Sequence, residues 1–122
     1  MRSALHVRSS GSVKIISLDG KTVRSRLVQA ARALRSEDSE VLSVWLFGSL
    51  ARGDYLPGSD ADLLIVLEKI DGPLSARIDR FADRFAGVGV PVDLFPVSEA
   101  ELEEREEDPF WAKVLAERRR LA

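Results

Sequence analysis

The chain contains no cysteine and a single histidine, His6, within its 122 residues. The lack of cysteine excludes disulfides, thiolate metal sites and cysteine nucleophiles. Because His6 lies in a polar N-terminal stretch, we do not expect histidine chemistry either. Long apolar runs are also missing. MRSALHVRSSGS lacks an apolar core of signal-peptide length, and the longest run, LLIVL, is far too short to span a bilayer. We therefore expect a cytoplasmic protein that does not enter a membrane.

An excess of charge of either sign is absent as well. The net charge is −2, and nonspecific nucleic-acid binding needs a basic field that this chain lacks, so no direct contact with nucleic acid is expected. Apolar residues make up 45% and charged residues 31% of the chain, which is typical of a soluble globular protein. The length predicts one domain.

The pattern of apolar residues predicts strands that alternate with helices. Residues 1–12 are expected to form a flexible tail, and residues 13–122 a single domain. Asp19 can cap a first helix over about residues 22–36, and a second is predicted over about 74–86. Two more helices are expected to begin at a capping box of Ser98 and Glu101 and at Asp108-Pro109. Strands are predicted over 13–18, 41–47, 62–67 and 90–97, the last either at a sheet edge or frayed at its ends because Pro91 and Pro96 cannot donate to a ladder. The fold class is α/β or α+β, with a small mixed sheet flanked by helices.

The segment FGSLARGDYLPGSDADLLIV, residues 47–66, places two aspartates where a buried strand begins. Alternate side chains of a strand point the same way, so the Cα atoms of Asp60 and Asp62 would lie about 6–7 Å apart on one face. Two ionised carboxylates repel at that distance, but a divalent cation lets both stay charged. Their oxygens suit Mg²⁺, and Mn²⁺ is the alternative. Ala61 and Leu63 would then face the core.

Two further features strengthen this interpretation against a solvated strand end with two incidental aspartates. Gly48-Ser49 ends the preceding strand, where glycine allows close approach of the backbone and serine suits phosphate oxygens. Asp93 lies in the apolar strand VPVDLFPV, and a charged residue in such a setting is rarely buried without a partner. Three carboxylates from two strands that face a phosphate-holding turn describe a two-metal phosphoryl or nucleotidyl transfer site.

The segment resembles the nucleotidyltransferase superfamily related to DNA polymerase β, and most of all its minimal nucleotidyltransferases. Their G-S, ten residues, D-x-D signature is matched by Gly48-Ser49 and Asp60-Ala61-Asp62 without a gap. The resemblance implies the polymerase β-like fold, with two Mg²⁺ ions bound by Asp60 and Asp62. It implies that Asp93 completes the shell of the catalytic metal. Gly48 and Ser49 would hold the β- and γ-phosphates of a nucleoside triphosphate, ATP foremost.

Several nearby residues have two interpretations at this point. Arg52 could contact the triphosphate or pair with Asp54. Ser59 could hydrogen-bond Asp60 near the nucleotide or serve only the turn. The acidic run EAELEEREED is expected to be a solvated helix face. Phe110 and Trp111 are expected to be core residues rather than a base-stacking platform.

The acceptor of the nucleotidyl group is indicated only by the resemblance. Minimal nucleotidyltransferases of this length typically act with a HEPN-domain partner, as antitoxin to its RNase toxin, and some transfer AMP to a tyrosine of that partner. One alternative is a non-catalytic antitoxin of the same fold that neutralises the toxin by binding, with a vestigial site. Another is a small-molecule nucleotidyltransferase that is active as an oligomer.

Overall fold

The computed structural model describes residues 5–10, 13–18, 20–56, 58–69 and 72–122, with backbone alone before residue 20. A four-stranded sheet forms the centre of the fold, in the order β5-β4-β3-β6. Its strands are β3 (Val41–Phe47), β4 (Ala61–Leu67), β5 (Val92–Ser98) and β6 (Arg119–Arg120). β3 is antiparallel to both β4 and β6, whereas β4 and β5 are parallel, so the sheet is mixed as predicted.

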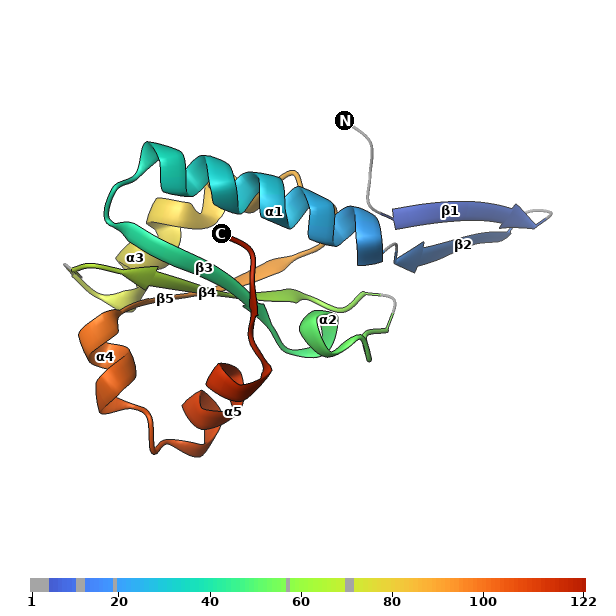
Figure 1. Cartoon of the computed structure of the whole chain (residues 1–122). Helices are drawn as coiled ribbons and strands as arrows, with labels where there is room; N and C mark the ends of the chain where they lie inside the picture. Colours follow the sequence, from blue (N-terminus) through green and yellow to red (C-terminus); the bar gives the residue numbers. More distant parts are fainter. Residues whose placement is uncertain (1–4, 11–12, 19, 57, 70–71) are drawn as a thin grey trace.

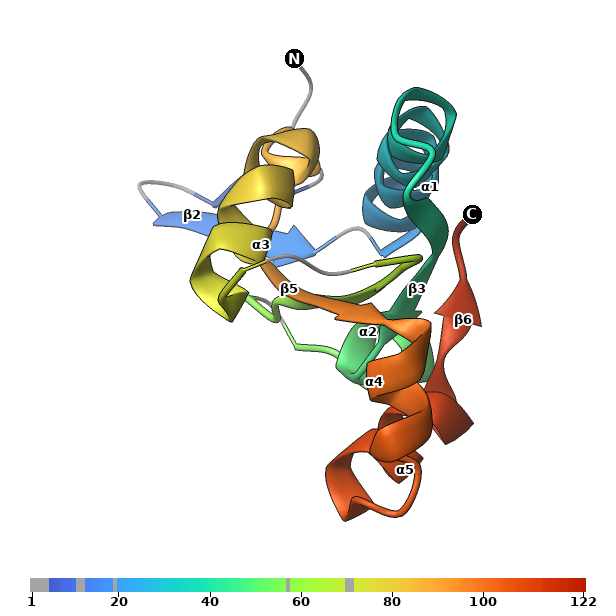
Figure 2. The same cartoon turned by 90° about the vertical axis from the view of Figure 1, so that its left-hand side faces the viewer.

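Helices cover both faces of this sheet (Figure 1, Figure 2). One face carries α1 (Gly20–Glu37), α3 (Leu74–Ala82) and the 3-10 turn η1 (Asp83–Phe85). The other carries α4 (Glu99–Glu104) and α5 (Pro109–Glu117). The predicted α/β architecture is confirmed. No helix within the described ranges is long and apolar enough to cross a membrane.

Side-chain alternation along the strands divides the core into two parts. On the α1 side, Leu63 and Ile65 of β4 pack with Leu27 of α1, and all three are fully buried. On the α5 side, Leu64 and Val66 of β4 pack in a second cluster with residues of β3, β5 and α5. Because β4 is covered on both faces, its sequence is a continuous apolar run rather than an alternating one.

Local capping signals set the beginnings of α4 and α5 as the sequence predicts. Ser98 Oγ accepts from the Glu101 backbone N–H and the Glu101 carboxylate accepts from the Ser98 N–H, each at 3.1 Å. Asp108 accepts from the backbone N–H of Phe110 at 2.9 Å, with Pro109 in the first turn. Both caps satisfy N–H groups that have no partner inside the helix.

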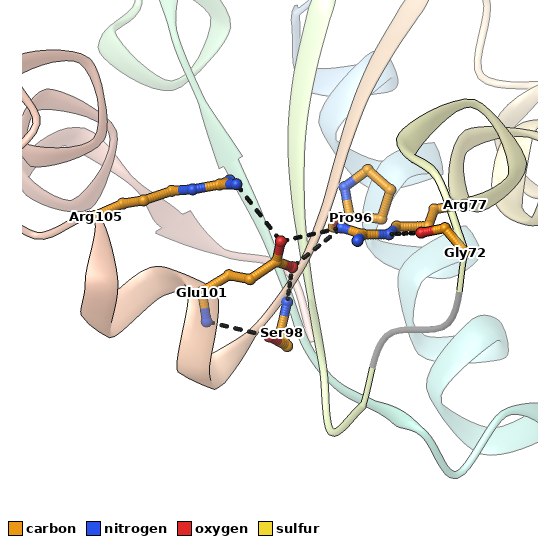
Figure 3. A network of polar contacts seen from close by, with 6 residues as sticks. All are labelled: Gly72, Arg77, Pro96, Ser98, Glu101 and Arg105. Carbon is orange, nitrogen blue, oxygen red and sulfur yellow. Dashed lines mark hydrogen bonds and ion pairs between the residues drawn. The ribbon is translucent and has the colours of Figure 1, made fainter.

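The Glu101 carboxylate also joins α3, β5 and α4 (Figure 3). Arg77 of α3 donates to Glu101 at 3.0 Å and to the Pro96 carbonyl of β5 at 3.4 Å. Arg105 pairs with the same carboxylate at 3.5 Å. Burial alone would raise the pKa of Glu101, but the Ser98 N–H and then the charge of Arg77 outweigh it, and the net pKa is lowered. The network thus attaches the α4 side of the sheet to α3.

The N-terminal segment differs from its prediction. Residues 5–10, expected within a flexible tail, form β1 (Leu5–Ser10), which pairs antiparallel with β2 (Val13–Leu18) in a separate two-stranded sheet. Figure 1 shows this hairpin beyond the start of α1, away from the central sheet. β2 confirms the predicted strand over 13–18. The remaining residues of the expected tail, 1–4 and 11–12, and the predicted cap Asp19 lie outside the described residues.

Smaller differences concern the ends of elements. The second predicted helix ends at Ala82 and continues as η1. Arg119 and Arg120, two arginines of a C-terminal basic run, form β6 and pair with β3. β5 lies at the opposite edge of the sheet, which is one of the two outcomes predicted from its prolines.

Candidate nucleotidyl transfer site

The site begins where β3 ends. The chain turns at Gly48 into α2 (Ser49–Arg52), one helical turn held by the Arg52 N–H, which donates to the Gly48 carbonyl at 3.0 Å. Gly48 has φ +77°, in the left-handed region that favours glycine. A Cβ at this position would also collide with Asp62 Oδ2. Gly48 therefore leaves room for the Asp62 carboxylate against the backbone, a role that the sequence does not reveal.

Strand pairing brings Asp62 beside two other parts of the site. In the antiparallel pair Asp62 is opposite Phe47, the residue before Gly48, and in the parallel pair it is opposite Asp93. Its neighbours Ala61 and Leu63 are fully buried, as the alternation predicts. Asp60 is exposed and precedes the first residue of β4. The register thus makes Asp62 and Asp93 direct neighbours.

The carboxylates interact electrostatically. The pKa of Asp62 is raised, first by burial and then by the charges of Asp93 and Asp60, while Arg52 acts in the opposite direction. The repulsion between such neighbouring carboxylates is relieved when a cation binds or when one of them takes up a proton. All three predicted carboxylates therefore contribute to one local field of negative charge.

Asp93 is located where predicted but for a different reason. From its apolar neighbours we expected Asp93 to be a charge that needs a partner, yet Asp93 is exposed. Alternation explains this result: Leu94 faces the buried α1 side, whereas Asp93 shares its face with Phe95 and Val97. Asp93 lies on β5, at the sheet edge, and is accessible to a ligand there.

Two predicted nucleotide-binding residues have protein partners. Arg52 donates to Asp54 at 3.0 Å and to Glu117 of α5 at 2.9 Å. Of its two interpretations, the pairing with Asp54 is observed. Ser59 Oγ accepts from the Leu56 N–H at 2.9 Å, which is the turn role. Phosphate contact by either residue remains a prediction.

The predicted magnesium site is incomplete as a protein cage. Among the residues that the structure describes, no group of three or more His, Cys, Asp or Glu side chains is arranged to hold a metal ion. Mg²⁺, however, usually takes one or two carboxylates, with water and substrate phosphates as its other ligands. Asp62 and Asp93, which are opposite each other in the sheet, supply two carboxylates of that donor set, and the ion itself and the part of Asp60 stay predictions.

A pocket of about 320 Å³ opens beside the Gly48 turn. One wall is formed by the ends of β3 and β4 with α2, through Phe47, Gly48, Ser49, Arg52 and Asp62. The other wall is α5, through Phe110, Lys113, Val114 and Glu117. The pocket brings Gly48, Ser49, Arg52 and Asp62 together, whereas Asp60, Asp93 and Ser59 are not part of its lining. Its size is within the range of small-molecule sites.

Helix α5 is the part of the site that sequence reasoning missed. Its four pocket residues lie at spacings of three, four and seven, which is one face of a helix. That spacing was readable from the sequence. Phe110 was expected in the core, but 48% of its surface is exposed.

Comparison with known proteins identifies the family to which this architecture belongs. A model of the nucleotidyltransferase domain matches residues 27–121, most of the chain. The chain belongs to the nucleotidyltransferase domain family. The match includes the Gly48-Ser49 turn and the three aspartates Asp60, Asp62 and Asp93, so the predicted nucleotidyltransferase domain is confirmed, whereas the narrower minimal-nucleotidyltransferase assignment stays a prediction.

Solved structures of this fold agree with the assignment. A protein from Sulfolobus solfataricus classed as a nucleotidyltransferase is 29% identical, with a TM-score of 0.54, over 73% of this chain and 81% of that one. A chain from a toxin–antitoxin structure with AMP-PNP is 19% identical, with a TM-score of 0.55, over 81% of this chain and 72% of that one. The second likeness shows the fold alone. No curated protein matches the chain.

Proposed function

We propose that this protein is a magnesium-dependent nucleotidyltransferase that transfers AMP from ATP to a hydroxyl of a partner protein. The observation that carries the proposal is the register that makes Asp62 and Asp93 neighbours, with Gly48 leaving room for the Asp62 carboxylate beside the Ser49 turn. Membership of the family supports the reaction class. The arrangement needs no protein nucleophile, in agreement with a chain without cysteine.

The reaction is an in-line displacement at the α-phosphorus. The acceptor oxygen forms a bond to phosphorus, the bond to the oxygen that bridges to the β-phosphate breaks, and pyrophosphate leaves. The acceptor proton passes to water. Magnesium, held by Asp60, Asp62 and Asp93, would neutralise phosphate charge and favour the deprotonated acceptor. Ser49 and the backbone at Gly48 would position the β- and γ-phosphates.

We further propose that the acceptor is a tyrosine of a HEPN-domain RNase toxin and that the chain acts as its antitoxin. The fold neighbour solved as a toxin–antitoxin with AMP-PNP supports this assignment, at the level of fold. The exposed position of Asp93 supports it as well, because a macromolecular acceptor must reach the carboxylates from outside.

Labelling of the partner tests the proposal. The purified protein is incubated with Mg²⁺, each α-³²P-labelled nucleoside triphosphate and the candidate toxin, and intact mass is measured in parallel. We expect label from ATP and the added mass of AMP on the toxin, lost in a Tyr→Phe variant of the acceptor. An unmodified toxin that is still inhibited in a tight complex would favour the non-catalytic antitoxin. Label on a small molecule but not on the toxin would favour the oligomeric small-molecule enzyme.

A further inference from the structure

We infer that Phe110 of α5 is the platform on which the nucleobase of the bound triphosphate stacks. The inference rests on the proposed function and adds a nucleoside-binding wall to it. Ser49, Arg52 and Asp62 line one wall of the pocket, and Phe110 provides an aromatic surface on the opposite wall, which also carries Lys113 and Glu117. A nucleoside triphosphate likewise combines a planar base, which suits Phe110, with a charged chain, which suits the polar residues.

Three neighbouring rings hold Phe110 in place. Its ring centroid lies 6.3 Å from that of Phe47, 6.0 Å from that of Phe95 and 5.3 Å from that of Trp111. The contacts with Phe47 and Trp111 are edge-to-face, at interplanar angles of 78° and 79°. Such contacts are favourable geometries for aromatic pairs and fix the orientation of the ring.

The backbone of Phe110 is fixed as well. The Asp108 carboxylate accepts from the N–H of Phe110 at 2.9 Å, which anchors the first turn of α5. Even so, 48% of the surface of Phe110 is exposed. An aromatic ring that is held on one side and open on the other binds a planar ligand with little loss of conformational entropy.

The aromatic cluster adjoins the carboxylates. Phe47 is opposite Asp62 in the sheet, and Phe95 follows Asp93 by two residues on the same face of β5. A base on Phe110 would therefore lie over the face of the sheet from which Asp62 and Asp93 project. Base–aromatic stacking tolerates every base, so we expect all four triphosphates to bind, purines more tightly because their rings are larger.

The test compares two ligands by titration calorimetry with Mg²⁺: ATP, and inorganic tripolyphosphate, which has no base. Phe110→Ala should weaken ATP binding roughly 5- to 100-fold, the range for loss of one stacked base, and leave tripolyphosphate binding unchanged. Phe110→Tyr should retain ATP affinity, and Phe110→Leu, which keeps an apolar side chain without a ring face, should not. Leu74→Ala, which shortens another half-exposed apolar residue on α3, is the matched control and should bind both ligands normally.

Circular dichroism verifies that each variant is folded, and Phe110→Leu replaces Phe110→Ala if the latter is not. Equal affinities of the wild type and the Leu and Ala variants for ATP would overturn the inference, as would equal weakening of both ligands. If the wild-type protein binds neither ATP nor tripolyphosphate, the proposed function fails first, which distinguishes the two failures.

Discussion

The two faces of the central sheet differ in chemistry. The face under α1 and α3 is largely aliphatic and closely packed, with Leu27, Leu63 and Ile65 fully buried. The face under α4 and α5 is aromatic and more open, with half-buried Trp45 and Trp111 and the exposed ring of Phe110. Asp62 and Asp93 project on the second face. The closely packed core and the proposed ligand site thus lie on opposite sides of one sheet.

The dense aliphatic face contributes stability that the electrostatics of the other face reduce. On the open face, burial and then the charges of Asp93 and Asp60 raise the pKa of Asp62. Functional sites commonly reduce stability in this way, and the loss is offset elsewhere in the fold. Substitutions on the two faces should therefore separate activity from stability.

The largest effect is expected at Asp93. If the proposed function holds, Asp93→Asn should slow nucleotidyl transfer about a thousandfold. A metal ion lowers the barrier of such a reaction by several kcal/mol, and each change of about 1.4 kcal/mol in the barrier alters the rate tenfold. ATP affinity should change little, since Asp60 and Asp62 remain. Asp79→Asn, which removes an exposed carboxylate from α3, is the control and should be fully active. Lost ATP binding with normal turnover at saturation would show that Asp93 has another role.

Leu27→Ala should have the largest effect on stability. Removing this fully buried side chain should lower the free energy of unfolding by about 2–5 kcal/mol, because a cavity remains in the aliphatic core. Phe110→Ala on the other face should cost only about 1 kcal/mol, because the ring is half in water. Urea unfolding measures both. The reverse order would contradict the division of roles between the two faces.

Gly48→Ala should impair both stability and transfer. The backbone of Gly48, with φ +77° and ψ −158°, lies in a region almost restricted to glycine and costs an alanine roughly 1–3 kcal/mol, and the new Cβ would also displace the Asp62 carboxylate. Gly53→Ala is the matched control, since Gly53 has φ +86° but open space at its Cβ position. Thermal melts and transfer assays should show strain in both variants and loss of transfer in Gly48→Ala alone. Equal transfer rates would show that room for Asp62 is not what Gly48 provides.

The smallest expected effect is a gain in stability on substitution of Asp62. The raised pKa of Asp62 means that the folded protein favours the protonated carboxyl. The contribution of Asp62 to stability is therefore greatest below the ordinary pKa of the group. That contribution is lost as the pH rises through the pKa of the folded state. Asp62→Asn should therefore stabilise the metal-free protein at pH 7, by roughly 0.5–2 kcal/mol, as substitutions at strained sites do. Near pH 3, where the carboxyl is protonated in both states, roughly no gain is expected. Thermal melts at both pH values are the measurement, and a loss of stability at pH 7 would refute the argument.

The sequence by itself determined the features that depend on neighbouring residues. The capping box of Ser98 and Glu101, the Asp108 cap and the helical period of α1 predicted their elements, because a cap or a period is a contact between residues a few positions apart. The spacing from Gly48-Ser49 to Asp60 and Asp62 predicted the family for the same reason, since it lies within one turn and return loop.

Only the tertiary structure decided which distant residues meet. The register that sets Asp93 beside Asp62, the pairing of Arg52 with Glu117, the pairing of β6 with β3 and the wall formed by Phe110 are contacts between segments far apart in the chain. Strand register and helix docking are selected by the burial of whole faces, and a shift of one residue would turn every side chain of a strand to the other face. As a large apolar residue, Phe110 is therefore predicted to be in the core. Its place on the pocket wall follows only from how α5 packs on the sheet.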